Sequence, residues 1–497
     1  MVQFSKCVTK LKLKLSNKAK IVASRHVIAK LLHKELQDHG MVFEISKCAR
    51  DLGISHSAAV SRPNKLLVSQ FRKVSNRISK IKNIAKISRH AKKLFTGSAY
   101  ASCTWGHQAC GVSESAIIQL ERDALSSTGI SPAGRCRTIS LCTAFGVLGT
   151  PRARIIRDTF REWFCIVRSF TDVCQIRLLM DAWTSAISSL ASTPASCRKV
   201  RGLLSNVICI LLRAGWSPSA FNRWEDRDGD VWILNGSISP DKCSSAVIKS
   251  MLSVELVRAN EHCDGKGIAN GVDFNATLSL VRNSSSNYPF MCTLQSILSA
   301  CMWPAERVAK CASSLSPICP RCGQDVESSL HCFWTCPANA HIEDCTVADT
   351  QSLVQTAVAC STDEPCMWLR GILPSHHTAI DNTCLPSVDL KVIYEHEVDA
   401  VWSSGIFYGD PSGGELTGFT DIRRCGCAVV SADTNGQLRF GARFNLPGIV
   451  QTVPRAELFC LVWLVRRLTP LSDIEYITDN KGLYDTFWEA LEQAALV

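Results

Sequence analysis

Residues 405–414, 451–458 and 474–480 read GIFYGDPSGG, QTVPRAEL and IEYITDN, and these stretches decide the fold of the C-terminal part of the chain. Asp410 ends a β-like run, Glu457 lies in the first turn of an apolar helix, and Asp479 ends another β-like run. Metal-dependent hydrolysis of a phosphodiester needs acidic oxygens that converge from separate elements, and Mg²⁺ prefers such hard oxygen ligands. The three carboxylates are therefore candidate metal ligands.

The residues between these stretches predict the order strand, strand, strand, helix, strand, helix. Alternation predicts a strand whose buried face carries Leu438, Phe440, Ala442 and Phe444. Pro454 suits the start of the helix. The predicted apolar stripe of that helix is Leu458, Leu461, Val462 and Val465. We therefore expect an α/β domain over residues 391–497, with a mixed sheet and flanking helices.

These stretches resemble the motifs of retroelement RNase H domains. Tyr408-Gly409-Asp410 followed by Ser412-Gly413 resembles the first-strand aspartate motif, QTVPRAEL the helix motif that carries the glutamate, and residues 477–480 (ITDN) the fourth-strand aspartate motif. The interval of 22 residues from Glu457 to Asp479 also fits the family. The resemblance implies that the catalytic residues Asp410, Glu457 and Asp479 bind Mg²⁺ and that the domain cleaves the RNA strand of an RNA–DNA hybrid.

The segment departs from the family pattern at two places. Pro411 replaces the glycine that usually follows the first aspartate, so we expect a different backbone there. The printed sequence ends 18 residues after Asp479, whereas the family's last strand, last helix and fourth carboxylate normally lie beyond that point. The expectation is a C-terminally truncated domain. The alternative to a ribonuclease is a non-catalytic nucleic-acid-binding remnant of a retrotransposon polyprotein.

A cysteine–histidine pattern precedes this domain. Its spacing is Cys-x2-Cys-x8-His-x4-Cys, and the four residues are Cys319, Cys322, His331 and Cys336. Tetrahedral Zn²⁺ takes four nitrogen or sulfur ligands, which predicts a structural zinc knuckle over residues 315–345. Other candidates for the fourth ligand are Cys332, His341 and Cys345. The spacing resembles the zinc-binding segment between reverse transcriptase and RNase H in non-LTR retrotransposons.

Positive charge is concentrated at the N-terminus. The whole chain of 497 residues has 55 Lys and Arg against 44 Asp and Glu, whereas its first 100 residues have 22 against 4. Apolar residues spaced three and four apart predict an amphipathic helix over about residues 64–94. The basic residues expected on its exposed side are Arg72, Lys73, Arg77, Lys80 and Lys82. This pattern indicates nucleic-acid binding (RNA–DNA hybrid, RNA or DNA), and the alternative is a solvated basic face or a coiled-coil strand.

Residues 1–125 resemble more diffusely the region after the palm in non-LTR reverse transcriptases, including its thumb-like helix. The similar stretches are residues 13–24 (LKLSNKAKIVAS), 47–54 (KCARDLGI) and 98–125 (SAYASCTWGHQACGVSESAIIQLERDAL). A Tyr-x-Asp-Asp motif is missing, so we expect no polymerase activity, and a partner chain would have to supply the palm. A second interpretation of residues 49–60 is a helix-turn-helix with Gly53 in the turn.

The remaining segments are less informative. Residues 126–300 have the patterns of a mainly helical region of unknown role, and residues 346–390 have the Ser, Thr and Pro content of a linker. The 26 cysteines are scattered, which favours a reducing compartment. The sequence has no run of about 18 apolar residues that could span a membrane. We therefore expect an intracellular protein, in the nucleus or the cytoplasm.

Overall fold

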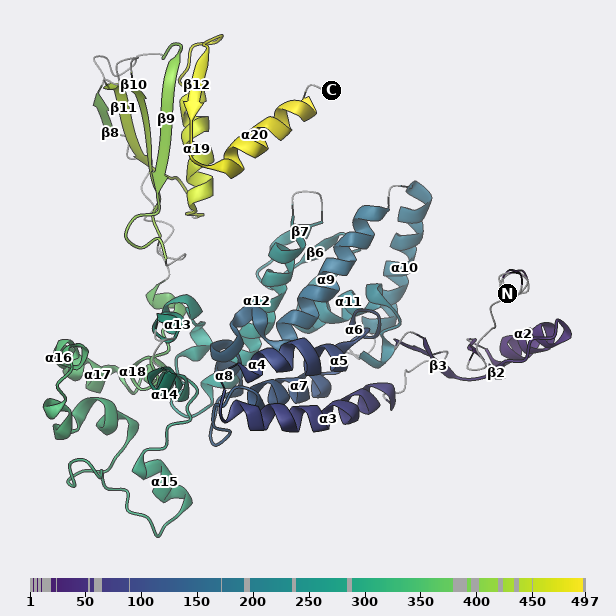
Figure 1. Cartoon of the computed structure of the whole chain (residues 1–497), viewed down its shortest axis with the longest axis horizontal. Coiled ribbons are helices and arrows are strands. Elements are labelled where there is room, and N and C mark those ends of the chain that lie inside the picture. The colour runs from purple at the N-terminus through teal and green to yellow at the C-terminus, as the bar shows by residue number, and fades with distance from the viewer. Residues whose placement is uncertain are drawn as a thin grey trace. The chain divides into compact units, whose positions relative to one another are not determined.

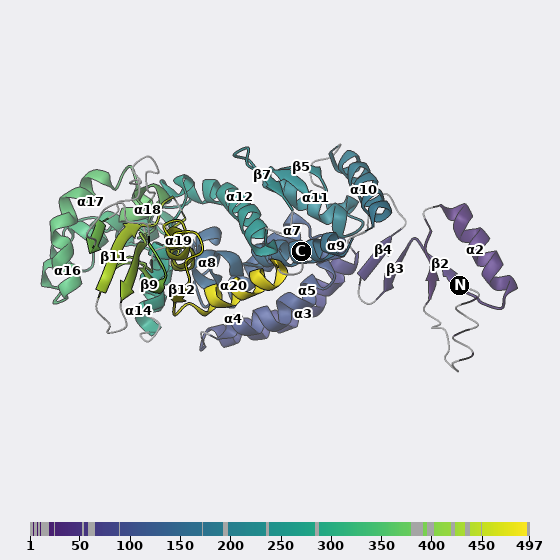
Figure 2. The same cartoon turned by 90° about the horizontal axis from the view of Figure 1, so that it is seen from above.

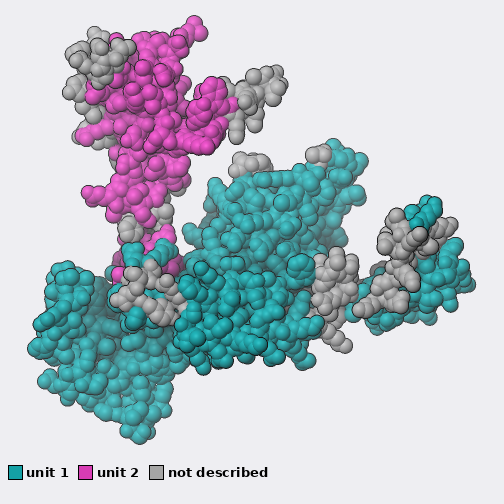
Figure 3. Space-filling view, in the orientation of Figure 1, with its two compact units in different colours: residues 1–269, 281–372 teal, residues 270–280, 373–497 magenta. Residues whose placement is uncertain are grey.

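The computed structural model describes most of the chain as two compact units. The described residues are 3, 7, 10, 19–23, 25–51, 54–57, 65–88, 90–170, 172–191, 197–234, 238–283, 288–378, 391–394, 402–418, 423–432, 438–448 and 450–494. Unit 1 comprises Met1–Ala269 and Val281–Ile372, and unit 2 comprises Asn270–Leu280 and Leu373–Val497 (Figure 3). The five-part division expected from the sequence stays a prediction. Most of the chain is helical, and no helix among the described residues is long and apolar enough to cross a membrane.

The first elements of unit 1 are short. A parallel strand pair, β1 (Lys20–Ile21) and β2 (Glu44–Ile45), brackets α2 (His26–Asp38). An antiparallel hairpin follows, formed by β3 (Cys48–Asp51) and β4 (Ile54–Ser57). The helix-turn-helix interpretation of this region is therefore wrong for its described residues. Backbone pairing of Cys48–Asp51 with Ile54–Ser57 decided against two helices, because this pairing is non-local and the spacing pattern does not contain it.

The predicted basic helix is α3 (Lys65–Ala85). Its apolar seam is confirmed where side-chain burial is described: Val74, Ile81 and Ala85 are buried, and Phe71 and Ile78 are half-buried. The helix ends nine residues earlier than expected, and the chain continues through α4 (Ala91–Leu94), the π-helix η1 (Phe95–Tyr100) and α5 (Ala101–Thr104). This second helical run packs along α3 (Figure 1; Figure 2).

Helices also form most of residues 107–298. They are α6 (His107–Cys110), α7 (Glu114–Ser126), α8 (Arg137–Phe145), α9 (Pro151–Ser169), α10 (Val173–Ala191), α11 (Leu203–Ala214), α12 (Pro240–Asn260), α13 (Phe274–Asn283) and α14 (Tyr288–Leu298). Thr150 and Ser239 cap α9 and α12, each followed by a proline in the first turn. A small antiparallel sheet contains β5 (Ser217–Ala220), β6 (Arg223–Glu225) and β7 (Val231–Ile233). Trp163, Trp183 and Trp224 fill the core between these elements.

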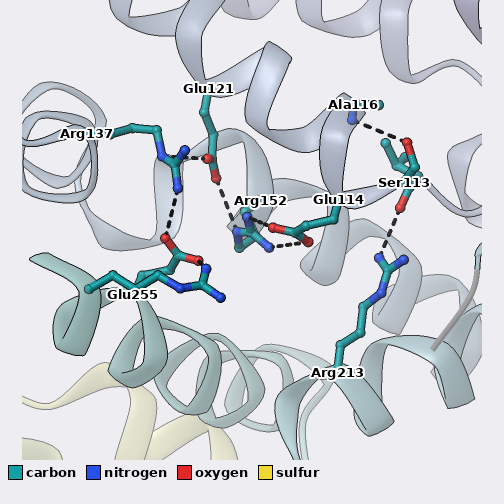
Figure 4. A network of polar contacts seen from close by, with 10 residues as sticks. Ser113, Glu114, Ala116, Glu121, Arg137, Arg152, Arg213 and Glu255 are labelled. Atoms are coloured by element: carbon teal, nitrogen blue, oxygen red, sulfur yellow. Dashed lines mark hydrogen bonds and ion pairs between the residues drawn. The ribbon is translucent and has the colours of Figure 1, made fainter. Parts of the chain in front are cut away.

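A network of ion pairs joins four of these helices (Figure 4). Glu121 of α7 contacts Arg152 of α9 at 3.2 Å and Arg137 of α8 at 3.3 Å. Arg137 also contacts Glu255 of α12 at 3.1 Å, and Arg152 donates to Glu114 at the start of α7. The Glu121 side chain is only 5% exposed, and burial raises its pKa in spite of the two guanidinium groups. These four helices therefore meet around a buried, charge-paired centre.

The end of unit 1 is folded where the sequence predicted a linker. Short helices occupy residues 305–368: α15 (Ala305–Cys311), η6 (His331–Thr335), η7 (Pro337–His341), α16 (Cys345–Thr350), η8 (Gln351–Leu353), α17 (Val354–Cys360) and α18 (Pro365–Trp368). Ala357 and Cys366 are buried. Polar residues and prolines are common in linkers, but they are also common at the starts of helices. Asp344 caps α16, and Pro365 lies in the first turn of α18. Residues 379–390 of the predicted linker lie outside the described residues.

Unit 2 contains a five-stranded mixed sheet in the order β12-β9-β10-β11-β8. The strands are β8 (Lys391–Tyr394), β9 (Gly405–Ser412), β10 (Gly426–Ala432), β11 (Leu438–Asn445) and β12 (Ile474–Ile477). Strands β9, β10, β11 and β8 pair antiparallel in that order, and β12 pairs parallel to β9. α19 (Val453–Val465) connects β11 to β12 and packs on β9 and β10, and α20 (Lys481–Ala494) follows β12 (Figure 1). The predicted order of elements over residues 405–494 is confirmed.

The buried face of α19 differs from the predicted stripe. Ala456, Cys460, Trp463 and Leu464 are the apolar residues that α19 buries against the sheet. Leu458 and Val465 of the predicted stripe are more than half exposed. The helix is apolar on most of its circumference, so spacing alone does not distinguish its faces. Packing against β9 and β10 selected the face that also buries Glu457.

Candidate metal centres

The carboxylates Asp410 and Asp479 occupy matching positions on two neighbouring strands, Asp410 within β9 and Asp479 two residues after the end of β12. In the parallel pairing, Ile477 of β12 lies opposite Tyr408 of β9. Asp479 and Asp410 each follow these partners by two residues. The parallel register therefore brings both aspartates to the same end of the two paired strands, although they are 69 residues apart in the sequence.

Glu457 of α19 is the buried member of this carboxylate group. It is 4% exposed, and Thr478 donates a hydrogen bond to its Oε2 at 3.4 Å. Burial raises the pKa of Glu457, and the negative charges of Asp479 and Asp410 raise it further. Asp479 and Asp410 therefore lie close enough to Glu457 for their charges to act on its carboxyl. Their oxygens do not all lie within 4.8 Å of one another, so they are less tightly grouped than the cysteine–histidine cluster described below.

Two neighbouring residues explain why the first strand and the helix have this local structure. A Cβ atom at Gly409 would lie 1.8 Å from the Tyr476 hydroxyl oxygen, so the strand beside Asp410 needs a glycine. Gln451 is buried before α19, where its amide donates to the carbonyls of Leu446 and Gly448 and accepts from the Cys425 N–H at 2.8 Å. Gln451 therefore fixes the start of the helix that carries the glutamate.

Pro411 is accommodated within β9. It lies opposite Cys427 in the antiparallel pairing with β10, and that pairing continues to Ser412. On the other side, the described pairing of β12 with β9 ends at Tyr408. The missing N–H of the proline consequently leaves the regular strand intact as far as Ser412.

The cysteine–histidine pattern forms a compact cluster that could hold a metal ion. Its members are Cys319, Cys322, His331 and Cys336, whose ligand atoms all lie within 4.8 Å of one another. Cys319 Sγ is 3.9 Å from Cys336 Sγ, and Cys322 Sγ is 3.4 Å from His331 Nε2. Two sulfurs bound to one tetrahedral Zn²⁺ at about 2.3 Å would lie roughly 3.8 Å apart, so the donor atoms fit such an ion. The alternatives Cys332, His341 and Cys345 are outside the cluster.

Backbone geometry prepares the first cysteine pair for metal binding. Gly323 has φ +69° and donates its N–H to the Cys319 carbonyl, closing a tight turn. The N–H groups of Asp325 and Gln324 lower the pKa of the Cys322 thiol. Burial raises the pKa of Cys319, but backbone N–H groups outweigh it and lower the value overall. Both shifts favour the thiolate, which is the form that binds metals.

Surrounding side chains hold the second half of the cluster. Asp325 Oδ2 lies 4.0 Å from His331 Nδ1, the ring nitrogen that faces away from Cys322. Arg321 donates to the Asn339 side chain at 2.8 Å and to the Cys332 carbonyl at 2.6 Å. A carboxylate near the outer histidine nitrogen is a common feature of metal sites, because it orients the ring.

The five basic residues predicted on α3 all lie exposed. They are Arg72, Lys73, Arg77, Lys80 and Lys82. The helix contains six Lys and Arg residues and no Asp or Glu. Within the part of the chain that the structure describes, none of the five lies within 4.0 Å of a carboxylate oxygen. This face of the helix therefore carries charge that the described chain does not neutralise.

Gln451 and Thr478 act on the carboxylate group but were not among the residues selected from the sequence. Both lie inside the motifs that carry Glu457 and Asp479, so the motif context was the available indication. Comparisons of the chain with known protein families, with curated proteins and with solved structures give no match.

Proposed function

We propose that this chain is a retroelement-derived protein, similar to the C-terminal portion of a non-LTR retrotransposon reverse transcriptase, whose unit 2 is an RNase H-like endonuclease. Its substrate is the RNA strand of an RNA–DNA hybrid. The observation that carries the proposal is that β9, the residues after β12, and α19 each bring one carboxylate to the same part of unit 2, where the charges of Asp479 and Asp410 raise the pKa of Glu457. The parallel placement of β12 beside β9, with α19 between β11 and β12 in sequence, supports the same assignment.

The carboxylate group suits Mg²⁺ because its donors are hard oxygens and their mutual repulsion is relieved by a divalent cation. When bound, such an ion activates water and stabilises charge on the phosphate. Asp410 and Asp479 would supply oxygens from the sheet edge, and Glu457 from the helix. Thr478 holds one Glu457 oxygen at 3.4 Å and thereby orients the buried carboxylate. Gln451 keeps the start of α19, and hence Glu457, in place.

Zinc is the ion we propose for the cysteine–histidine cluster. Three sulfurs and one imidazole nitrogen form a closed set of soft and borderline ligands, which is typical of structural Zn²⁺ sites. The role proposed for this cluster is to hold residues 315–345 in a fold that their small size would otherwise not support. The exposed basic face of α3 is proposed to bind the phosphates of the nucleic acid.

Cleavage of a labelled RNA–DNA hybrid in Mg²⁺ tests the proposal. The wild-type chain is compared with the double variant Asp410→Asn, Asp479→Asn, and Glu475→Gln serves as the matched control because Glu475 is an exposed carboxylate on β12. We expect cleavage by the wild type and the control and none by the double variant. Equal cleavage by all three chains would mean that the carboxylate group is not the active site.

The second candidate function is a non-catalytic nucleic-acid-binding remnant. It is favoured by the looser grouping of the three carboxylates and by the unneutralised basic face of α3. Under this alternative, the wild-type chain binds the hybrid but leaves it intact in Mg²⁺.

A further inference from the structure

An open groove lies between α3 and the helical run η1–α5 in unit 1. Its volume is about 740 Å³, within the range of roughly 300–1,000 Å³ that small-molecule sites occupy. The described residues that line it include two basic side chains, several small residues and one aromatic ring, and they are Gln70, Lys73, Val74, Arg77, Gly97, Ser98, Ala101, Ser102 and Trp105. The groove therefore has room for about one or two nucleotide units.

One wall of the groove is positively charged. Lys73 and Arg77 project from α3, and the described lining contains no Asp or Glu. Arg77 Nη1 donates to the hydroxyl oxygens of Ser98 at 3.2 Å and Ser102 at 3.1 Å, which are neutral partners. The guanidinium is thus held over the groove with its charge uncompensated by any described carboxylate, ready for an anionic ligand.

The opposite wall is built from small residues. Gly97, Ser98, Ala101 and Ser102 lie on one side of the helical run, and all except the half-buried Ser98 are exposed. A Cβ atom added at Gly97 would meet no atom within 4 Å, so the groove is open at that point. Small side chains allow a sugar-phosphate backbone to approach the helix closely, and the two hydroxyls can hydrogen-bond to it.

Trp105 lines the same groove and is 63% exposed. A large aromatic ring exposed beside uncompensated basic side chains is the combination found in proteins that bind single strands, because any base can stack on such a ring while Lys and Arg follow the backbone. In a duplex the base faces are already covered by their neighbours, and a surface tryptophan cannot reach them.

We propose that this groove binds a single-stranded nucleic acid, with phosphates on Lys73 and Arg77 and a base stacked on Trp105. The inference rests on the nucleic-acid-binding role proposed for α3 and specifies the form of its ligand. It does not require hydrolysis in unit 2. The unpaired strand beside a hybrid is a ligand of the required chemistry.

The test measures binding of a fluorescent single-stranded oligonucleotide of about 12 nucleotides to the full chain by anisotropy, with the matching duplex as the comparison. Trp105→Ala is expected to weaken single-strand binding roughly tenfold, and Trp105→Phe to restore most of it. Gly97→Leu is expected to weaken binding as well, because its side chain fills the groove while leucine suits a helix better than glycine. Phe290→Ala is the control for loss of an exposed aromatic ring.

Salt dependence tests the phosphate contacts. Each phosphate contact to a single strand contributes about 0.7 to the magnitude of the slope of log affinity against log salt concentration. The double variant Lys73→Gln, Arg77→Gln should therefore reduce that magnitude by about 1.4. Unchanged single-strand affinity in both Trp105→Ala and Gly97→Leu would overturn the proposal that the groove binds single strands. If, in addition, the Lys73→Gln, Arg77→Gln variant lost binding to the duplex, the basic face of α3 would be a duplex-binding surface instead. The Asp410→Asn, Asp479→Asn variant should bind normally, so failure of the hydrolase and failure of the groove are distinguishable.

Discussion

At the scale of single residues, Glu457 illustrates how a buried carboxylate acquires a special environment. Its immediate neighbours Ala456 and Leu458 are apolar, and its face of the helix is turned toward the sheet. Burial and the charges of Asp479 and Asp410 disfavour its ionised form. Sites of this kind commonly lower the stability of the free protein, and a bound cation then restores it.

The sign of the pH dependence follows from the raised pKa of Glu457. The unfolded carboxyl has a pKa of about 4.3, so its folded form keeps a proton to higher pH. The contribution of the protonated Glu457 carboxyl to stability is complete below about pH 4.3 and is lost as the pH rises through its raised folded-state pKa. We predict that Glu457→Gln raises the thermal unfolding temperature of unit 2 by a few degrees at neutral pH and has little effect under acidic conditions.

Thermal unfolding followed over a pH series checks this prediction, with Glu475→Gln as the exposed control on β12. Mg²⁺ should stabilise the wild type more than Glu457→Gln. A variant that is less stable than wild type at neutral pH would show that the three carboxylates do not repel one another.

At the scale of elements, local sequence patterns predicted some features of the helices and strands, whereas non-local packing decided others. The seam of α3 and the buried face of β11 formed by Phe440, Ala442 and Phe444 were predicted from spacing, whereas Leu438 of that predicted face is 53% exposed at the start of the strand. The ligand spacing of the cysteine–histidine segment was equally local, since Gly323 and the 319–322 turn bring two sulfurs together within four residues. The buried face of α19 was not predictable, because apolar residues cover most of that helix.

Zinc removal should unfold the cysteine–histidine segment. We predict that Cys319→Ser, Cys322→Ser abolishes zinc binding, measured by metal analysis of the purified chain. Trp334, whose indole donates to the Trp368 carbonyl at 2.7 Å, should change its fluorescence because the segment loses its fold. Cys332→Ser is the matched control, since Cys332 lies beside His331 but outside the cluster. Unchanged zinc content in the double variant would contradict the assignment.

At the scale of the molecule, the ion-pair network of unit 1 is the feature that depends most on tertiary structure. Glu121, Arg137, Arg152 and Glu255 come from four helices spread over about a quarter of the chain (Figure 4). Removing one partner of a buried ion pair typically costs about 3–5 kcal/mol, because the other charge loses its compensation. Exposed pairs typically contribute about 0–1 kcal/mol.

We predict that Arg152→Met lowers the free energy of unfolding of unit 1 by about 3 kcal/mol, because the buried Glu121 carboxylate loses one of its two guanidinium partners and Glu114 loses its own. Chemical denaturation followed by tryptophan fluorescence measures it, because Trp163, Trp183 and Trp224 report on the adjoining core. The control is Arg161→Gln, whose pair with Asp241 at 2.9 Å has both side chains more than half exposed. Equal effects of the two variants would mean that burial of the network contributes nothing.

The sequence by itself determined the order of elements over residues 405–494, the amphipathic seam of α3 and the Cys319–Cys322 pair, because each depends on residues close together in the chain. The fourth ligand of the cysteine–histidine cluster, Cys336 and not Cys332, His341 or Cys345, was decided by the structure. Tertiary structure alone decided the pairing that made residues 48–57 a hairpin, the face of α19 that buries Glu457, and the groove between α3 and Trp105. The physical reason is the same in each case. These features arise where separate segments compete to bury surface or pair their backbones, and the free energy of that choice belongs to the contact between segments.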